Sequence, residues 1–129
     1  MCEVSIIGID LAKRSFQLHG AGVDGSAAFR RKVSREKLLQ FLERQPTCLV
    51  AMEACATSHL WGREIAKLGH EVKLIPPIYV KPFVKRQKND TADAEAIAEA
   101  ASRKNMRFVA VKAEEQQAQS MVFRTRDLL

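Results

Sequence analysis

The chain has 129 residues, of which 47% are hydrophobic and 28% are charged, and this balance is typical of one globular domain. No apolar run approaches the roughly 20 residues of a membrane-spanning helix, and Glu3 and Asp10 interrupt the apolar stretch near the N-terminus. We therefore expect a cytoplasmic protein without a signal peptide or membrane contact. The net charge of +6 fits a polyanionic partner, although a solvated basic surface would give the same value.

The first quarter of the chain predicts an antiparallel meander of three strands. Val4 to Ala12 is a mainly apolar run that carries Asp10 near its end. Ser15 to Val23 alternates apolar and polar residues, as a half-buried strand does. Asp24-Gly25 is a hairpin turn signal, and Ala27 to Val33 is the third predicted strand.

The next stretch predicts helices alternating with buried strands. Ser34 is a predicted N-cap for an amphipathic helix, and the apolar run from Thr47 to Met52 predicts a strand buried on both faces, directly before Glu53. Thr57 or Ser58 is the predicted cap of a second helix that ends at Gly69. The apolar faces predicted for the two helices are Leu38, Leu39, Phe41 and Leu42 in the first, and Leu60, Trp61, Ile65 and Leu68 in the second.

The last part of the chain predicts one more strand, followed mainly by helices. His70 to Ile75 is the fifth strand, and Pro82 interrupts a helix or loop between Ile78 and Lys88. Asp90 to Ser102 is an alanine-rich helix, Met106 to Val111 is a short extended piece, and Glu114 to Leu129 is a final helix. The order β-β-β-α-β-α-β predicts an α/β fold, a mixed five-stranded sheet flanked by helices, as in the ribonuclease H-like fold.

Four carboxylates occupy positions at which such a fold binds ligands. Asp10 and Glu53 fall at the C-terminal ends of buried strands, where open α/β sheets hold their ligands. Asp90 and Asp93 are three residues apart and therefore share one face of the next helix. Carboxylate oxygens suit Mg²⁺, and such ions support phosphodiester chemistry. The alternative is structural, because Asp90 and Asp93 could cap their helix, and Asp10 and Glu53 could be ordinary turn or loop acids.

Basic residues lie close to these acids in the sequence. Candidates for contacts with nucleic-acid phosphates are Lys13, Arg14, Lys85, Arg86 and Lys88. Solvated surface side chains are an equally good interpretation of the same residues.

Three sequence segments resemble a known family. GIDLAKRSF, AMEAC and KNDTADAEAIAEAA are similar to the N-terminal RuvC-like domain of the DEDD-type insertion-sequence transposases, which include the Piv-type DNA invertases. The resemblance implies that Asp10, Glu53, Asp90 and Asp93 are the catalytic and metal-binding residues, with Mg²⁺ or alternatively Mn²⁺ as cofactor. It further implies DNA strand cleavage and exchange during transposition, a structured guide RNA as a second partner, and a homo-oligomer for the full-length protein.

The resemblance also implies how the chain is divided. Residues 1–112 would form the RuvC-like catalytic domain, and residues 113–129 would begin a helix that leads to a C-terminal domain carrying a serine nucleophile. We therefore expect the chain alone to lack full recombinase activity. Two alternatives are a stand-alone nuclease that resolves Holliday junctions and a non-catalytic nucleic-acid-binding module. A third, an actin-like or sugar-kinase ATPase, is disfavoured because Leu11-Ala12-Lys13 lacks the glycine of a phosphate loop.

Overall fold

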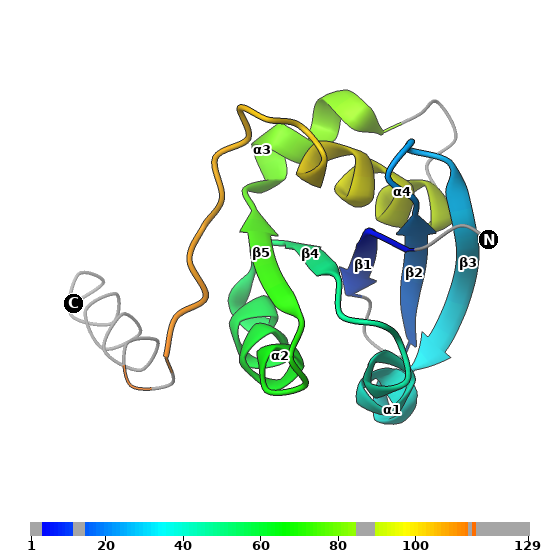
Figure 1. Ribbon diagram of the computed structural model, residues 1–129. Helices are drawn as coiled ribbons and strands as arrows, with labels where there is room; N and C mark the ends of the chain where they lie inside the picture. Colours follow the sequence, from blue (N-terminus) through cyan, green and yellow to red (C-terminus); the bar gives the residue numbers. More distant parts are fainter. Residues whose placement is uncertain (1–3, 12–14, 85–89, 114, 116–129) are drawn as a thin grey trace, which may run out of the picture.

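The computed structural model describes residues 4–11, 15–84, 90–113 and 115, and for residues 90–92 it describes the backbone only. Five strands form one sheet in the order β3-β2-β1-β4-β5 (Figure 1). The pairs β1–β2 and β2–β3 are antiparallel, whereas β1–β4 and β4–β5 are parallel. The mixed sheet predicted from the sequence is therefore confirmed. The strands are β1 (Ile6–Leu11), β2 (Ser15–Ala21), β3 (Ala27–Ser34), β4 (Leu49–Glu53) and β5 (Glu71–Ile75).

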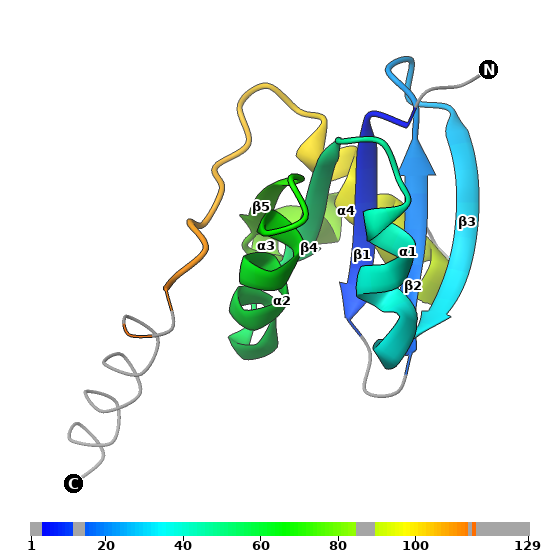
Figure 2. The ribbon, with the colours of Figure 1, turned by 60° about the horizontal axis from the view of Figure 1, so that its bottom comes forward.

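Helices cover both faces of the sheet. One face is covered by α1 (Leu38–Glu43), which follows the short 3₁₀ turn η1 (Arg35–Lys37), and by α2 (Ala56–Ala66). The other is covered by α3 (Pro77–Val80), the 3₁₀ turn η2 (Lys81–Phe83) and α4 (Asp90–Ala101). Figure 2 shows α1 and α2 in front of the sheet and α4 behind it. No described helix is long and apolar enough to cross a membrane.

The face toward α1 and α2 holds the larger core. Alternating residues of the inner strands, such as Ile7 and Ile9, point to this face and are fully buried. Phe16 of β2 packs edge-to-face against Trp61 of α2, with ring centroids 5.2 Å apart. Leu38, Leu42 and Ile65 are the fully buried residues that the two helices contribute.

Two glycines end their elements as the sequence predicts. Gly25 has a φ of +86° in the hairpin between β2 and β3, and Gly69 has a φ of +98° after α2. In the same hairpin, the Ser26 hydroxyl donates to Asp24 Oδ1 at 2.7 Å, and this hydrogen bond lowers the pKa of Asp24. Local turn chemistry therefore sets both chain reversals.

Several details of the helix predictions are wrong. Ser34 makes no capping hydrogen bond, because a 3₁₀ turn lies between it and α1. Cys55, rather than Thr57 or Ser58, is the N-cap of α2. Ser58 reaches back instead, since its Oγ accepts from the Cys55 backbone N–H at 2.9 Å. Leu60 is 44% exposed, so it does not belong to the inward face of the helix.

After α4 the chain returns to the free edge of β5. Val109 N–H donates to Leu74 O at 2.7 Å, and this isolated bridge is the β pairing described for the predicted extended piece. Lys112 is then held on α2, because its N–H donates to His59 Nδ1 at 3.0 Å and its carbonyl accepts from Arg63 Nη1 at 2.6 Å. The final predicted helix, apart from residue 115, lies outside the described residues.

Candidate metal centre

Asp10 and Glu53 lie side by side at the C-terminal ends of two parallel strands. The register pairs Ile9 of β1 with Met52 of β4, so the next residue on each strand is one of the two acids. Neighbouring strands are about 4.8 Å apart, which brings the two backbones within reach of one ligand. Both side chains are half-buried. The predicted placement of both acids at the C-terminal ends of buried strands is confirmed, and the two strands are neighbours in the sheet.

Both acids point to the face that α4 covers. Side chains alternate along a strand, so Asp10 shares its face with Gly8, and Glu53 shares its face with Ala51. Gly8 directly contacts α4, since a Cβ at this position would lie 2.4 Å from Ala94 O and 2.7 Å from Ala98 N. Ala51 belongs to the core cluster that includes Ile97 of α4. The two carboxylates therefore lie under the same helix.

The close approach of α4 brings in a third acid. Gly8 and Ala51 have little or no side chain, and α4 presents alanines to them, so the helix lies almost on the strand backbone. Asp93 is half-buried and directly precedes Ala94, the residue over Gly8. Sequence reasoning did not assign Gly8 a role. The sequence could have indicated this role, because a glycine inside a buried strand often marks a place where another backbone approaches closely.

The electrostatics of Glu53 show that this residue lies near Asp93. Burial raises the pKa of Glu53, and the negative charge of Asp93 raises it further. A carboxylate held beside a like charge in a partly buried place is costly unless a cation compensates it. Perturbed carboxyl groups of this kind are candidates for a functional site.

The described acids do not by themselves enclose an ion. No three described His, Cys, Asp or Glu side chains are grouped closely enough to hold a metal. The fourth predicted ligand, Asp90, is the first residue of α4, one helical turn before Asp93, and its side chain lies outside the described part of the chain. The donor chemistry nevertheless fits a hard divalent cation, because all the candidate ligands are carboxylates near one edge of the sheet.

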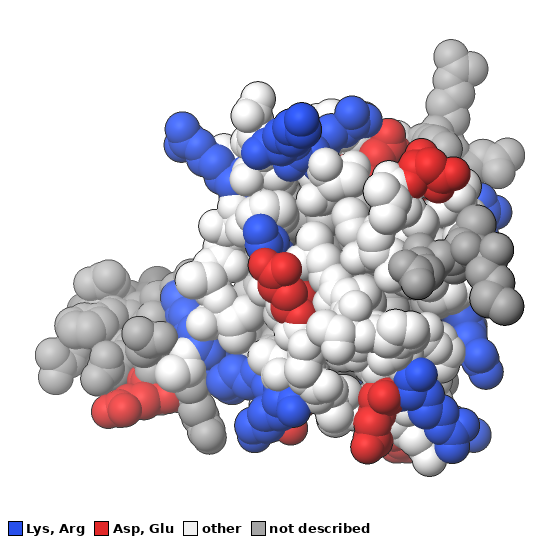
Figure 3. All heavy atoms as spheres, viewed as in Figure 1, with Lys and Arg blue, Asp and Glu red and all other residues white. Residues whose placement is uncertain are grey.

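The predicted phosphate-binding residues remain untested by the structure. Lys13, Arg14, Lys85, Arg86 and Lys88 all lie outside the described residues. Figure 3 shows that described Lys and Arg side chains form separate groups around the rim of one face. The three histidines of the chain are buried, and the hydrogen bonds of His59 and His70 are structural. His70 Nε2 bonds to Leu42 O at 2.7 Å, and His59 holds Lys112 as described above.

Comparison with solved structures identifies the class of domain. The chain is similar to the structure of RuvC from Thermus thermophilus, with a TM-score of 0.59 and 15% identity over 81% of this chain and 99% of that one. The structure of RuvC from T. thermophilus in complex with a Holliday junction substrate matches with a TM-score of 0.50 and 13% identity, over 81% of this chain and 98% of that one. The fold is therefore the RuvC-like form of the ribonuclease H-like α/β fold.

Sequence comparison identifies the family. Residues 7–129 match the family of IS110-type DEDD transposases, and the chain belongs to that family. It is 52% identical over its whole length to the transposase for insertion sequence element IS1328 of Yersinia enterocolitica, covering 39% of that protein. It is also 51% identical over 98% of its length to a probable family 20 transposase of Pseudomonas aeruginosa, covering 38% of that protein. The chain thus spans less than two fifths of these relatives.

Proposed function

We propose that this chain is the metal-binding catalytic domain of a DNA transposase, in which four carboxylates hold a divalent cation against a DNA phosphate. The observation that carries the proposal is the placement of Asp10 and Glu53 at the C-terminal ends of adjacent parallel strands, under the helix that carries Asp93. The raised pKa of Glu53 beside Asp93 supports it further. Family membership supports DNA transposition as the process, and the RuvC-like fold supports phosphodiester chemistry.

The four acids have separate structural origins and one common role. Asp10 and Glu53 come from adjacent parallel strands, whereas Asp90 and Asp93 come from the first turns of α4. Mg²⁺, or Mn²⁺ in its place, would polarise the scissile phosphate and lower the pKa of an attacking hydroxyl group. A bound cation would favour the ionised form of Glu53, because the ligand form of a carboxyl group is the anion.

We propose that residues 1–112 form the catalytic domain and that residues 113–129 lead to a further domain, which supplies the nucleophile. This division agrees with the chain covering 39% of its Yersinia relative. A guide RNA and assembly into a homo-oligomer are further proposals, which rest on the family resemblance alone.

Calorimetric titration with MgCl₂ tests the metal site. Asp10→Asn keeps the shape of the side chain and removes its charge, so we expect the Kd for Mg²⁺ to rise by at least about tenfold, since even indirect changes around metal ligands cost this much. Asp24→Asn is the matched control, because Asp24 lies in the hairpin at the opposite end of the sheet and should leave Mg²⁺ binding unchanged. Equal Mg²⁺ affinity in the wild type and Asp10→Asn would exclude the proposed site.

A further inference from the structure

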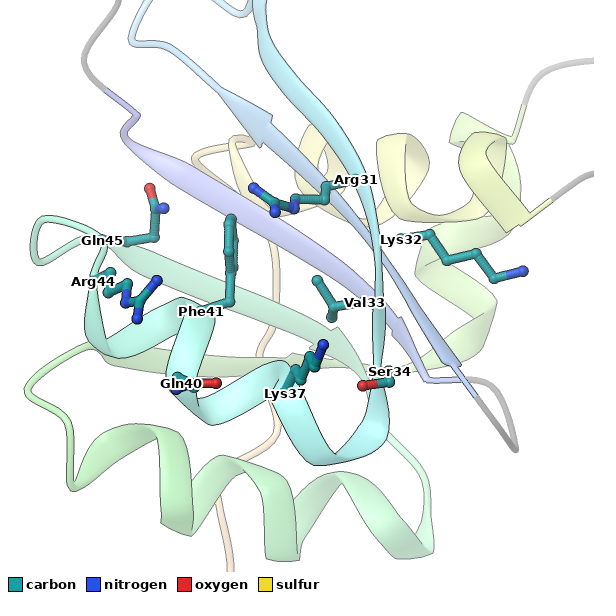
Figure 4. Close-up of a pocket in the computed structure, with 9 residues that line it drawn as sticks. All are labelled: Arg31, Lys32, Val33, Ser34, Lys37, Gln40, Phe41, Arg44 and Gln45. Atoms are coloured by element: carbon teal, nitrogen blue, oxygen red, sulfur yellow. The ribbon is translucent and has the colours of Figure 1, made fainter.

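A basic groove lies between the edge strand β3 and helix α1, on the sheet face opposite α4 (Figure 4). Its volume is about 590 Å³. The lining contains four cationic side chains and no carboxylate. The lining residues are Arg31, Lys32, Val33, Ser34, Lys37, Gln40, Phe41, Arg44 and Gln45.

Several basic residues outside the groove have carboxylate partners, whereas the groove cations have none among the described residues. Elsewhere Arg30 pairs with Glu95, Lys67 with Glu64 and Arg103 with Glu99. Within the described residues, none of the four groove cations lies within ion-pair distance of a carboxylate. Glu36 and Glu43 are on the same segment of chain, but neither lines the groove. The groove therefore keeps a concentrated positive charge that the described part of the protein does not neutralise.

The groove is organised around one aromatic ring. Phe41 is fixed by edge-to-face packing on Phe29, with centroids 5.7 Å apart. The Arg31 guanidinium lies over the Phe41 ring at 4.9 Å, so its position is held while its N–H groups stay available. Figure 4 shows Lys37 and Arg44 pointing toward the space around this ring, whereas Lys32 points to the other side of β3.

We propose that this groove binds the phosphodiester backbone of a nucleic acid and forms a second nucleic-acid surface, separate from the carboxylate site. Arg31, Lys37 and Arg44 would contact phosphates, while Gln40 and Gln45 supply neutral donors along the same wall. Cations spread along a strand and a helix suit an extended polyanion better than one small anion. We expect this binding to be independent of base sequence, because these side chains contact phosphates and the groove has few groups that could recognise base edges.

The placement of the groove gives the surface a distinct role. The carboxylates lie under α4 and the groove lies on the α1 face, so the two places are on opposite faces of the sheet. The groove would hold a second segment of DNA or RNA while the first is processed. This inference rests on the charges of the groove and does not require that the acids bind metal.

Binding to labelled nucleic acids tests the groove, measured by fluorescence anisotropy in EDTA so that the metal site plays no part. The probes are a DNA duplex and an RNA duplex of the same sequence, each titrated with this chain at several salt concentrations. The test variant is Lys37→Gln with Arg44→Gln, since both side chains are exposed and neither belongs to the core. The matched control is Lys104→Gln with Arg107→Gln, which removes the same charges from exposed positions after α4.

We expect the groove variant to weaken binding of at least one probe by about tenfold. The plot of log K against log salt should also become less steep, with the magnitude of its slope smaller by about 2, roughly one for each lost phosphate contact. The control should retain near wild-type affinity and slope. Loss with both probes would indicate a shared backbone contact, and loss with RNA alone would assign the groove to RNA. Equal losses in the groove variant and the control would overturn the proposal, because binding would then depend on net charge only.

Discussion

The two faces of the sheet are packed in different ways. The face toward α1 and α2 is filled by large side chains, such as Ile9, Leu42 and Met52, together with the Phe16–Trp61 pair. The face toward α4 has glycine and alanine where the helix crosses, so the backbones of α4 and β1 almost touch at Gly8. Large side chains separate the helices from the sheet on the first face. On the second face the small residues allow α4 to lie closer to the sheet.

This difference explains where the carboxylates meet. Asp and Glu have short side chains, so acids from a strand and a helix can reach one ion only where the two backbones lie close together. The small-residue face provides that approach and brings Asp93 near Glu53. The large-residue face is bordered instead by the basic groove at β3 and α1. The chemistry proposed for each face therefore follows from its packing.

The largest expected effect comes from adding one methyl group to the close-packed face. Gly8→Ala places a Cβ against the backbone of α4, which cannot move without displacing the whole helix. We expect the free energy of unfolding to fall by about 2 kcal/mol, within the range for overpacked cores. Urea denaturation followed by circular dichroism measures it. Because Asp93 moves with the helix, Mg²⁺ binding should weaken as well.

Gly20→Ala is the matched change on the other face. Its Cβ would lie 2.3 Å from the ring of Phe29, a side chain on an edge strand that can rotate away. Alanine also restricts the unfolded chain more than glycine, so the net change in unfolding free energy should be about 1 kcal/mol or less. Equal losses at Gly8 and Gly20 would contradict the difference between the two faces.

A smaller effect is expected from removing one charge at the carboxylate site. The pKa of Glu53 is raised in the folded chain, so the folded state binds more protons than the unfolded state between the two pKa values. The free energy of unfolding therefore falls as pH rises through that window. Without metal at neutral pH, Glu53→Gln should be slightly more stable than the wild type. Glu43→Gln is the control, because Glu43 is an exposed residue of α1, and this change should not increase the stability. A Glu53→Gln protein that is less stable than the wild type would contradict the prediction.

The sequence predicted the order and type of the described elements because local patterns determine them. Three local patterns each predict one type of element. They are the alternation in Ser15 to Val23, the turn at Asp24-Gly25 and the apolar run before Glu53. Helix starts were predicted less well. The choice of Cys55 over Thr57 or Ser58 depends on where β4 ends relative to α2, which the residues themselves do not encode. The inward face of α2 was also misjudged at Leu60, which is 44% exposed.

The site was predictable in part. Acids after buried strands and at a helix start predicted Asp10, Glu53, Asp90 and Asp93, but the close approach of α4 to the strands depends on Gly8, whose role is visible only when α4 is docked. The basic groove was missed because its residues come from a strand and a helix with different periods. Arg31 on β3 and Arg44 after α1 become neighbours of one cavity only in three dimensions.

The pKa of Glu53, followed by NMR of its carboxyl carbon, tests the central claim most directly. In the wild type without metal we expect a pKa above the ordinary glutamate value, and Asp93→Asn should lower it by removing the neighbouring charge. Saturating Mg²⁺ should lower the wild-type pKa below its metal-free value, because the cation binds only the ionised form. A Glu53 pKa that is unchanged by both Mg²⁺ and Asp93→Asn would contradict a shared carboxylate site.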